Sequence, residues 1–423
     1  MIANRRFVVD GIKSKLMNSG RRGFSTKAYV TKDASRFVKD GKRIQVGLWL
    51  LGTSGVLFTL GTFGGYNRNM RFGMNKIEWR AKGGIPKSDM EWEESYEDFK
   101  KFPEYLIRGQ PVTIEQYKQM FIMNKVQSKL GPGTLFIHLL PMVYFLSRGY
   151  FKGPMKKFAI IYSGLLAAIG LQGTYMDKKR PGLVEGEPLP PKSPNQLAFH
   201  NFLCFTYFGY GFWMALNMLR KAPNNIKRLD KFFGANSLRR HLMVSSHVLF
   251  PAVLITGFLM AGTGAGRSIT TYPKVGDNWT LTSEDLDKDE SFLTNLYTNR
   301  KLIHFNHRTL GIALGGLTAV QWVMLMRTKV GPAGKLGFTA LLVLLLGQLH
   351  IGGHMVTHKM QPEQVITHEL SAFLILTTFL YLMHIVRKPN PEVIRKIASN
   401  LKELHPKIYQ KVLAKYPKQM KKL

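Results

Sequence analysis

The sequence predicts an all-α integral membrane protein whose eight transmembrane helices form two pseudo-symmetric four-helix bundles. Hydrophobic residues make up 45% of the chain, yet Lys and Arg outnumber Asp and Glu by 60 to 26, which is typical of apolar spans joined by basic loops. Eight stretches approach the ~20 apolar residues needed to cross a bilayer. Residues 194–200 and 362–368 share the pattern Pro-x-Gln-apolar-x-x-His, and each opens an apolar run. This repeat predicts a duplicated membrane unit.

The first thirty residues, 1–30, have the composition of a mitochondrial transit peptide. They hold seven basic residues against one acidic residue, Asp10, with hydroxyl and small side chains. They lack the apolar core that a secretory signal needs, and a basic cytosolic tail is the alternative. The single cysteine, Cys204, excludes an internal disulfide and a thiolate metal cluster.

The eight spans divide into an N-terminal half at 45–218 and a C-terminal half at 242–386. We expect them near 45–65, 131–148, 157–176, 196–218, 242–263, 307–326, 335–357 and 365–386. Backbone groups in lipid must be satisfied within their own segment, so these spans are predicted as helices.

Charge predicts how the spans are oriented. Lys and Arg are concentrated in the links after the second, fourth and sixth spans and in the tail 387–423, and short basic loops stay on the side of import. Both termini are therefore predicted in the matrix of a mitochondrial inner-membrane protein. The longer links 66–130 and 264–306 would then face the intermembrane space.

Two segments outside the spans are predicted to be amphipathic. In the outer link, Trp92, Tyr96 and Phe99 recur at helical spacing among acidic residues, which indicates a helix packed on the membrane domain or a solvated acidic helix. The basic tail 387–423 carries apolar residues at helical spacing. It is expected to lie along an anionic lipid leaflet or to stay disordered.

Histidines at the starts of spans predict a haem site. His200 begins the fourth span and His368 the eighth, while His307 begins the sixth. Alternate spans start on the same membrane side, so His307 and His368 are expected at similar depth. An isolated membrane histidine is more often a helix contact, but two facing imidazoles can ligate one haem iron. Arg308 could then neutralise a propionate.

A second group of histidines lies on the seventh span. His350, His354 and His358 recur at every fourth position, so they form one stripe near the outer end of that helix. The spacing could hold a metal ion or a haem propionate. Because no carboxylate or thiolate is assigned to the stripe, a hydrogen-bonded helix contact is the favoured interpretation.

Short motifs give the chain a resemblance to the mitochondrial haem A synthase family over nearly all of residues 40–388. The Glu-Trp-Glu-Glu to Phe-Pro-Glu-Tyr segment is typical of the mitochondrial branch. The matching stretches are Ile77-Glu78-Trp79, Asp89-Met90-Glu91-Trp92-Glu93-Glu94, Phe102-Pro103-Glu104-Tyr105, Leu140-Pro141 with Tyr144-Phe145, Gly173 with Tyr175-Met176, Tyr272-Pro273-Lys274-Val275-Gly276-Asp277-Asn278-Trp279, Phe305-Asn306-His307-Arg308 and Thr367-His368.

The resemblance implies a function for each half. In that family the second half binds haem b through a histidine pair that matches His307 and His368. The first half binds haem O and oxidises a ring methyl to formyl, which gives haem A for cytochrome c oxidase; His200 matches one histidine of its pair. The implied partners are membrane lipid and cytochrome c oxidase or its assembly factors; a homo-oligomer is left open as a further alternative. No nucleic-acid partner is expected.

The chain departs from the family at the first-half site. The family pattern Met-Glu-aromatic-Ser/Ala-His-Arg aligns with residues 123–128, so Asn124 replaces a carboxylate, Gln127 a haem ligand and Ser128 an arginine. Arg71 likewise stands where an acidic residue is usual. A glutamine amide is a poor iron ligand, and an asparagine cannot act as a general base. His138 lies roughly 16 Å deeper along the helix and cannot take the place of Gln127.

The sequence therefore predicts a haem A synthase-like protein with a degenerate first half, in which binding of haem O or haem A is not expected. It would act in cytochrome c oxidase biogenesis or as an accessory subunit of a respiratory complex. One alternative is an active haem A synthase that uses His200 with an unexpected partner. Another is a proton-coupled transporter, which would need paired intramembrane carboxylates, and Glu369 is the one plausible carboxylate.

Overall fold

The computed structural model describes residues 36–69, 84–101, 105, 111–178, 193–220, 236–328, 330–358, 361–387, 391–415 and 417. The predicted transit peptide at 1–30 and Arg71 lie outside these residues. Within the described ranges, eight helices are long and apolar enough to cross a membrane. The predicted fold class, an all-α multi-pass membrane protein, is confirmed.

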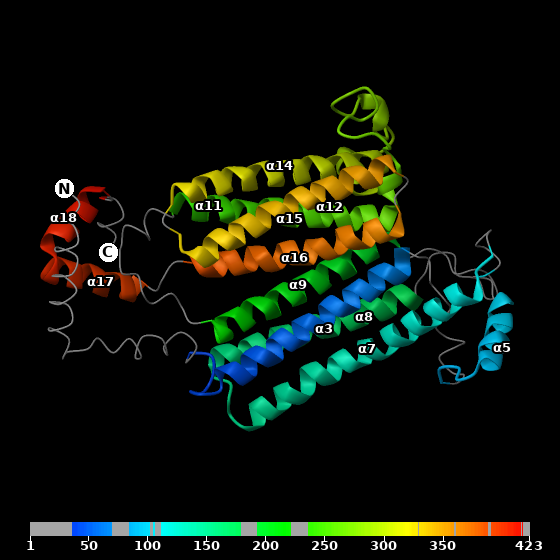
Figure 1. Cartoon of the computed structure of the whole chain (residues 1–423), viewed down its shortest axis with the longest axis horizontal. Helices are drawn as coiled ribbons and strands as arrows, with labels where there is room; N and C mark the ends of the chain where they lie inside the picture. The colour runs from blue at the N-terminus through cyan, green and yellow to red at the C-terminus, as the bar shows by residue number, and fades with distance from the viewer. Residues whose placement is uncertain are drawn as a thin grey trace, which may run out of the picture.

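The eight long helices run side by side as two groups of four (Figure 1). The first half contains α3 (Arg43–Asn69), α7 (Ile114–Ser147), α8 (Gly153–Lys178) and α9 (Pro194–Leu219). In the second half, α11 (Asn236–Val244) continues through a π-helical turn at Ser245–Leu249 into α12 (Phe250–Thr263), and α14 (Arg300–Met326), α15 (Pro332–Thr357) and α16 (Pro362–Val386) follow.

The two ends of the helix bundle differ. We call one the loop end, because it carries α5 (Asp89–Lys100) and the segment 264–299 with its short helix α13 (Phe292–Thr298). The other is the tail end, which carries the short links 148–152 and 327–331 and, beyond them, α17 (Pro391–Leu404) and α18 (Pro406–Lys415) (Figure 1). The assignment of the tail end to the matrix stays a prediction.

Prolines and caps explain where several helices begin. Pro194, Pro332 and Pro362 each occupy the first turn of their helix, where a missing N–H costs nothing and the fixed φ suits the helix. Asn299 caps α14, because its side-chain oxygen accepts the Leu302 N–H at 3.0 Å. The two Pro-x-Gln repeats therefore mark the starts of α9 and α16, as predicted.

Helix α7 is longer than the predicted second span. It begins at Ile114, where Thr113 and Gln116 form a reciprocal capping box, whereas the sequence placed the span at 131–148. Residues 114–130, which the sequence placed in the outer link, therefore belong to the same helix as the span. The predicted span begins later than the helix because polar residues lower the hydropathy of this stretch without interrupting its helical hydrogen bonds.

The predicted amphipathic helix in the outer link is α5, and its aromatic face is packed. Phe99 stacks on Tyr117 with ring centres 5.0 Å apart, and Trp92 meets Phe121 edge to face at 5.3 Å. Tyr117 and Phe121 lie in the first turns of α7. The packing interpretation is thus confirmed, with the loop-end extension of α7 as the surface that α5 covers.

The two halves meet along α3 and α9 on one side and α12 and α16 on the other. Phe373 of α16 lies at the centre of this contact. Its ring stacks on Phe205 at 3.9 Å and meets Phe58 and Phe208 edge to face at 5.4 and 5.3 Å. In a bilayer such close packing holds helices together, because lipid offers no hydrophobic driving force between them.

Candidate haem site

His307 and His368 lie together at the loop end of the second half. His307 comes from α14 and His368 from α16, and their ring centres are 6.2 Å apart with planes inclined by 63°. Two imidazoles that share one metal ion through bonds of about 2 Å have ring centres roughly 6 Å apart. The spacing of this pair therefore fits a single metal centre between the rings.

The hydrogen bonds of His307 orient its ring. Its Nδ1 lies 3.1 Å from the carbonyl oxygen of Val253 and 3.1 Å from the hydroxyl of Thr256. A carbonyl oxygen only accepts hydrogen bonds, so Nδ1 carries the proton and Nε2 keeps its lone pair. This is the tautomer that a metal-ligating histidine needs.

The backbone of His368 is also held in place. Its carbonyl oxygen accepts hydrogen bonds from Gln348 Nε2 and from the Ser371 hydroxyl, each at 2.9 Å, and Ser371 also donates to the Gln348 side-chain oxygen. The ring atom Nδ1 is buried and has no hydrogen-bond partner. The protein thus fixes the position of this residue and leaves a ring nitrogen for another partner.

A glycine on the neighbouring helix faces each ring. A Cβ on Gly257 would lie 3.1 Å from His307 Cε1, and one on Gly352 would lie 3.2 Å from His368 Cε1. A larger residue at either position would push the ring out of place. Small residues at these points let the helices approach closely enough to clamp both imidazoles.

Buried donors beside the histidine pair suit an anionic group. Arg308 is 9% exposed, and one of its terminal nitrogens donates to the Thr271 carbonyl at 3.0 Å. Its other terminal nitrogen and the Nδ1 of buried His304 have no hydrogen-bond partner. A carboxylate would satisfy the arginine nitrogen, and also the imidazole in the tautomer that carries a proton on Nδ1; guanidinium pairs with carboxylates through two parallel bonds. The residues present therefore fit the propionate end of a haem.

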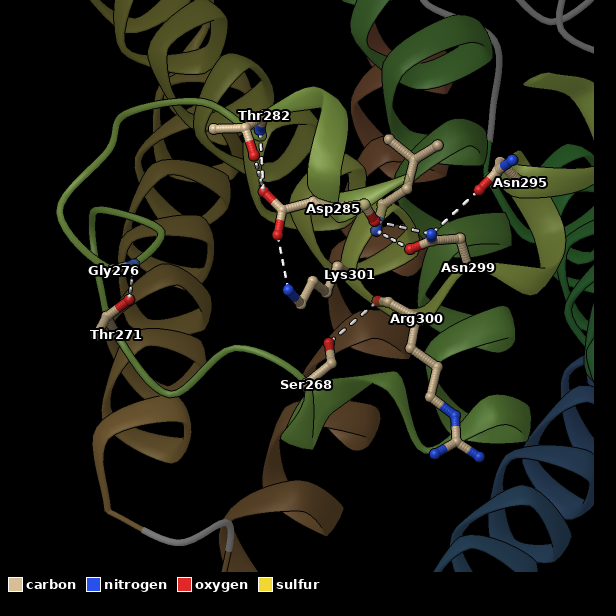
Figure 2. A network of polar contacts seen from close by, with 10 residues as sticks. Ser268, Thr271, Gly276, Thr282, Asp285, Asn295, Asn299, Arg300 and Lys301 are labelled. Atoms are coloured by element: carbon tan, nitrogen blue, oxygen red, sulfur yellow. Dashed lines mark hydrogen bonds and ion pairs between the residues drawn. The ribbon is translucent and has the colours of Figure 1, made fainter. Parts of the chain in front are cut away.

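A polar network in the loop fixes Thr271 beside the site (Figure 2). The Thr271 hydroxyl accepts the Gly276 N–H at 2.7 Å, and the Ser268 hydroxyl donates to the Arg300 carbonyl at 3.1 Å. Asp285 accepts from Lys301 at 2.7 Å, which with the amide of Thr282 holds the pKa of this carboxyl below its usual range. Hydrogen bonds thus order the loop that contains Thr271, whose carbonyl accepts from Arg308.

The first half has corresponding positions with different residues. A Cβ on Gly64 would lie 3.5 Å from Gln127 Nε2, and one on Gly173 would lie 3.4 Å from His200 Cε1. The α3–α7 pair corresponds to α12–α14, and α8–α9 corresponds to α15–α16. Gln127 therefore occupies the position that His307 has in the second half, and His200 the position of His368.

The other two substituted residues bond to their own helix. Asn124 is buried, and its amide donates to the Met120 carbonyl at 2.8 Å. The Ser128 hydroxyl donates to the Lys125 carbonyl at 2.8 Å. Neither contact supplies a negative charge or a base, and positions 124, 127 and 128 themselves carry two amides and a hydroxyl.

Comparison with known proteins decides the family. A family model described as "Cytochrome oxidase assembly protein" (COX15-CtaA) matches residues 47–380, which is most of the chain. The chain belongs to the COX15-CtaA family. The match covers most of both halves described above.

Individual relatives of this COX15-CtaA member carry the name Heme A synthase COX15. The Arabidopsis thaliana protein is 27% identical over 389 residues, covering 89% of this chain and 83% of the relative. The Homo sapiens protein is 27% identical over 351 residues, covering 81% and 83% respectively. The Saccharomyces cerevisiae protein is 25% identical over 369 residues, covering 81% and 76%.

In this family member His138 is part of a different structure. It is fully buried, with Nδ1 2.9 Å from the Tyr207 hydroxyl and Nε2 2.8 Å from the Ser163 hydroxyl. Tyr207 in turn stacks on Tyr162 at 4.1 Å. Both imidazole nitrogens are used, so His138 ties three helices together and does not face Gln127. Sequence reasoning missed this cluster, although two tyrosines within apolar spans were its signal.

The histidine stripe of the COX15-CtaA member lies on the exposed side of α15. His354 and His358 stack at 3.9 Å, and His350 lies 6.4 Å from His354. Gln364 of α16 donates to His354 Nδ1 at 3.0 Å. Within the described residues, no group of three or more His, Cys, Asp or Glu is placed to hold a metal ion. The helix-contact interpretation therefore agrees with the structure better than a metal site.

Proposed function

We propose that this protein holds one haem b between His307 and His368, and that its first half no longer converts haem O to haem A. On this proposal it acts in cytochrome c oxidase biogenesis or as an accessory subunit of a respiratory-chain complex. The observation that carries the proposal is the difference between two corresponding positions. Position 307 carries an imidazole that is oriented by a hydrogen bond, whereas position 127 carries an amide.

The second half offers what a haem requires. A haem bound there would supply one-electron redox chemistry. The Val253 carbonyl orients His307, while Gln348 holds the backbone of His368. Arg308 and His304 present buried donors to a carboxylate. Iron ligands, their orientation and charge neutralisation thus all come from residues of this half.

The first half has lost three of the groups its chemistry needs. Gln127 offers an amide, which is a poor iron ligand, and Asn124 cannot accept a proton or balance a developing positive charge. Ser128 carries no charge for a propionate. His200 remains, and Gly173 still faces it, so one imidazole of the pair implied by the resemblance is present. This retained contact is the observation that favours the alternative, an active synthase.

The location is part of the same proposal. The matching relatives include plant, animal and yeast proteins named Heme A synthase COX15, which supports a mitochondrial inner-membrane protein. The tail end carries the short basic links and the Lys-rich tail, so it would face the matrix with both termini.

Complementation in yeast tests the proposal. The chain is expressed in a Saccharomyces cerevisiae strain whose own Heme A synthase COX15 has been deleted, with the yeast protein as the positive control. We expect the chain to reach the inner membrane without restoring haem A or respiratory growth. Haem A in extracted mitochondria would overturn the proposal in favour of the active enzyme. A second measurement distinguishes the two proposed roles. A subunit of the respiratory complex should copurify with the assembled oxidase, whereas an assembly factor should not.

A further inference from the structure

The glutamine of the second Pro-x-Gln repeat lies on the loop-end side of the histidine pair. Gln364 is in the first turn of α16, four residues before His368, so the two side chains leave the helix on the same face, one turn apart. Both lie next to α15. A Cβ on Gly352 would lie 3.2 Å from the His368 ring, and Gln364 Nε2 lies 3.0 Å from Nδ1 of His354.

The amide of Gln364 can present hydrogen-bond donors to the interior. Its Oε1 is buried and has no hydrogen-bond partner. A half-turn about the last side-chain bond exchanges the oxygen and the nitrogen of a glutamine amide. In the turned amide, His354 Nδ1–H donates to Oε1, and the two N–H groups of Nε2 take the buried side. The imidazole of His354 then holds the amide in place while a donor faces inward.

Two residues of the loop connect this amide with the arginine beside the histidine pair. The Thr271 carbonyl accepts from Arg308 of α14 at 3.0 Å. The next residue, Tyr272, packs its ring on α15 at Gly353, where an added Cβ would lie 3.0 Å from the ring atom Cδ1. Gly353 directly precedes His354, which contacts the glutamine. The arginine of α14 and the glutamine of α16 therefore border the same short stretch of loop.

A haem brings two propionate carboxylates to this end of the site, and a buried carboxylate needs hydrogen-bond donors. Helix α14 offers the donors of Arg308 and His304, which suit one of the two. On α16, the Thr367 hydroxyl donates to the Glu363 carbonyl of its own helix at 2.7 Å. In the turn of α16 before His368, the side chain suited to the second carboxylate is therefore the glutamine amide.

We propose that Gln364 donates to the second propionate of the haem, and that His354 is a positioning residue that orients its amide. The inference rests on the proposed function, because it concerns the haem held between His307 and His368. It gives one member of the histidine stripe a role, since the contact between α15 and α16 through His354 then serves the haem. Hydrogen bonds to a charged carboxylate are among the stronger ones in proteins.

A series of charges at position 364 tests the assignment in the purified full-length protein. Transfer of haem to an apo-haem acceptor protein should be about tenfold faster in Gln364→Ala. It should be faster still in Gln364→Glu, because two carboxylates repel, and no faster than in the unmodified protein in Gln364→Lys. The midpoint potential of the haem should fall in Gln364→Glu and rise in Gln364→Lys. The matched control is Gln196→Glu at the same place in the first repeat, which should change neither quantity.

Three results would overturn the inference. Unchanged retention in Gln364→Glu would mean that the side chain does not face a carboxylate. Equal losses in Gln364→Glu and Gln364→Lys would mean a packing role, and an equal loss in Gln196→Glu a general effect of charge. If Gln364→Glu does not fold, Gln364→Lys decides, because faster loss of haem there contradicts a propionate partner. A haem that His307→Ala removes but that is insensitive to position 364 overturns this inference alone, whereas the absence of such a haem from the unmodified protein overturns the proposed function.

Discussion

His307 and His368 lie with their ring centres 6.2 Å apart, whereas the corresponding positions in the first half are occupied by Gln127 and His200. In both halves a glycine of the neighbouring helix faces each side chain. The two halves therefore share this arrangement of facing glycines and differ in the side chains that the glycines face. Restoring those side chains should restore the first site.

Reversal of three substitutions should create a second haem site. In Asn124→Glu with Gln127→His and Ser128→Arg, an imidazole faces Gly64 where the amide lies now, opposite His200. We expect the haem content of the purified protein to rise from one to two per chain. Adding His200→Ala to the triple variant should return the content to one. An unchanged content in the triple variant would mean that the first half differs in more than its ligands.

Arg308 should help to retain the haem by pairing with a propionate carboxylate of the haem. In Arg308→Gln the buried positive charge is lost, and we expect haem retention to fall about tenfold, measured as transfer to an apo-haem acceptor protein. Arg300→Gln, at an exposed position two turns earlier on the same helix, is the matched control. Equal retention in both variants would show that Arg308 serves the loop through Thr271 and not the haem.

Acid should loosen the loop over the site. Lys301 and the Thr282 amide hold the pKa of Asp285 below its usual range, so the stabilisation is fully present above pH ~4 and is lost as pH falls through the lower folded pKa. We expect Asp285→Asn to speed hydrogen exchange of residues 282–302 at neutral pH. That difference from the unmodified protein should vanish at low pH. Glu284→Gln, which removes an exposed neighbouring carboxylate, should leave hydrogen exchange of this segment unchanged at both pH values. If it speeds exchange as much as Asp285→Asn does, a specific contact of Asp285 with Lys301 and Thr282 is excluded.

His138 should matter for stability and not for haem. In His138→Phe the hydroxyls of Tyr207 and Ser163 lose their buried partner, which costs roughly 2–4 kcal/mol. We expect a lower Tm with an unchanged haem content. His247→Phe, which changes an exposed histidine, should leave both values unchanged. Loss of haem at an unaltered Tm would instead identify His138 as a ligand.

The sequence predicts the features that depend on local patterns. The two Pro-x-Gln repeats mark the starts of α9 and α16, and the depth argument for His307 and His368 places two residues together that the structure also brings together. The start of α7 was not predicted, because hydropathy indicates which residues cross the bilayer and not where the helix begins. Its first turns are polar but capped by Thr113.

Features built from distant segments could not be predicted. The link from Thr271 to Arg308 and the hydrogen bonds of His138 to Tyr207 and Ser163 join residues far apart in the chain. Their side chains meet only once the helices are packed, and no spacing in the sequence encodes that meeting. The glycines that face the histidines are also visible only in three dimensions, because a small residue in a span has many uses.

The reduced-minus-oxidised absorption spectrum of the purified protein, with haem and protein both quantified, tests the central claim most directly. We expect one bis-histidyl b-type haem per chain. We also expect that His307→Ala removes this haem, whereas His200→Ala leaves it in place. Two haems per chain, extractable haem A, or an unaltered spectrum in His307→Ala would contradict it.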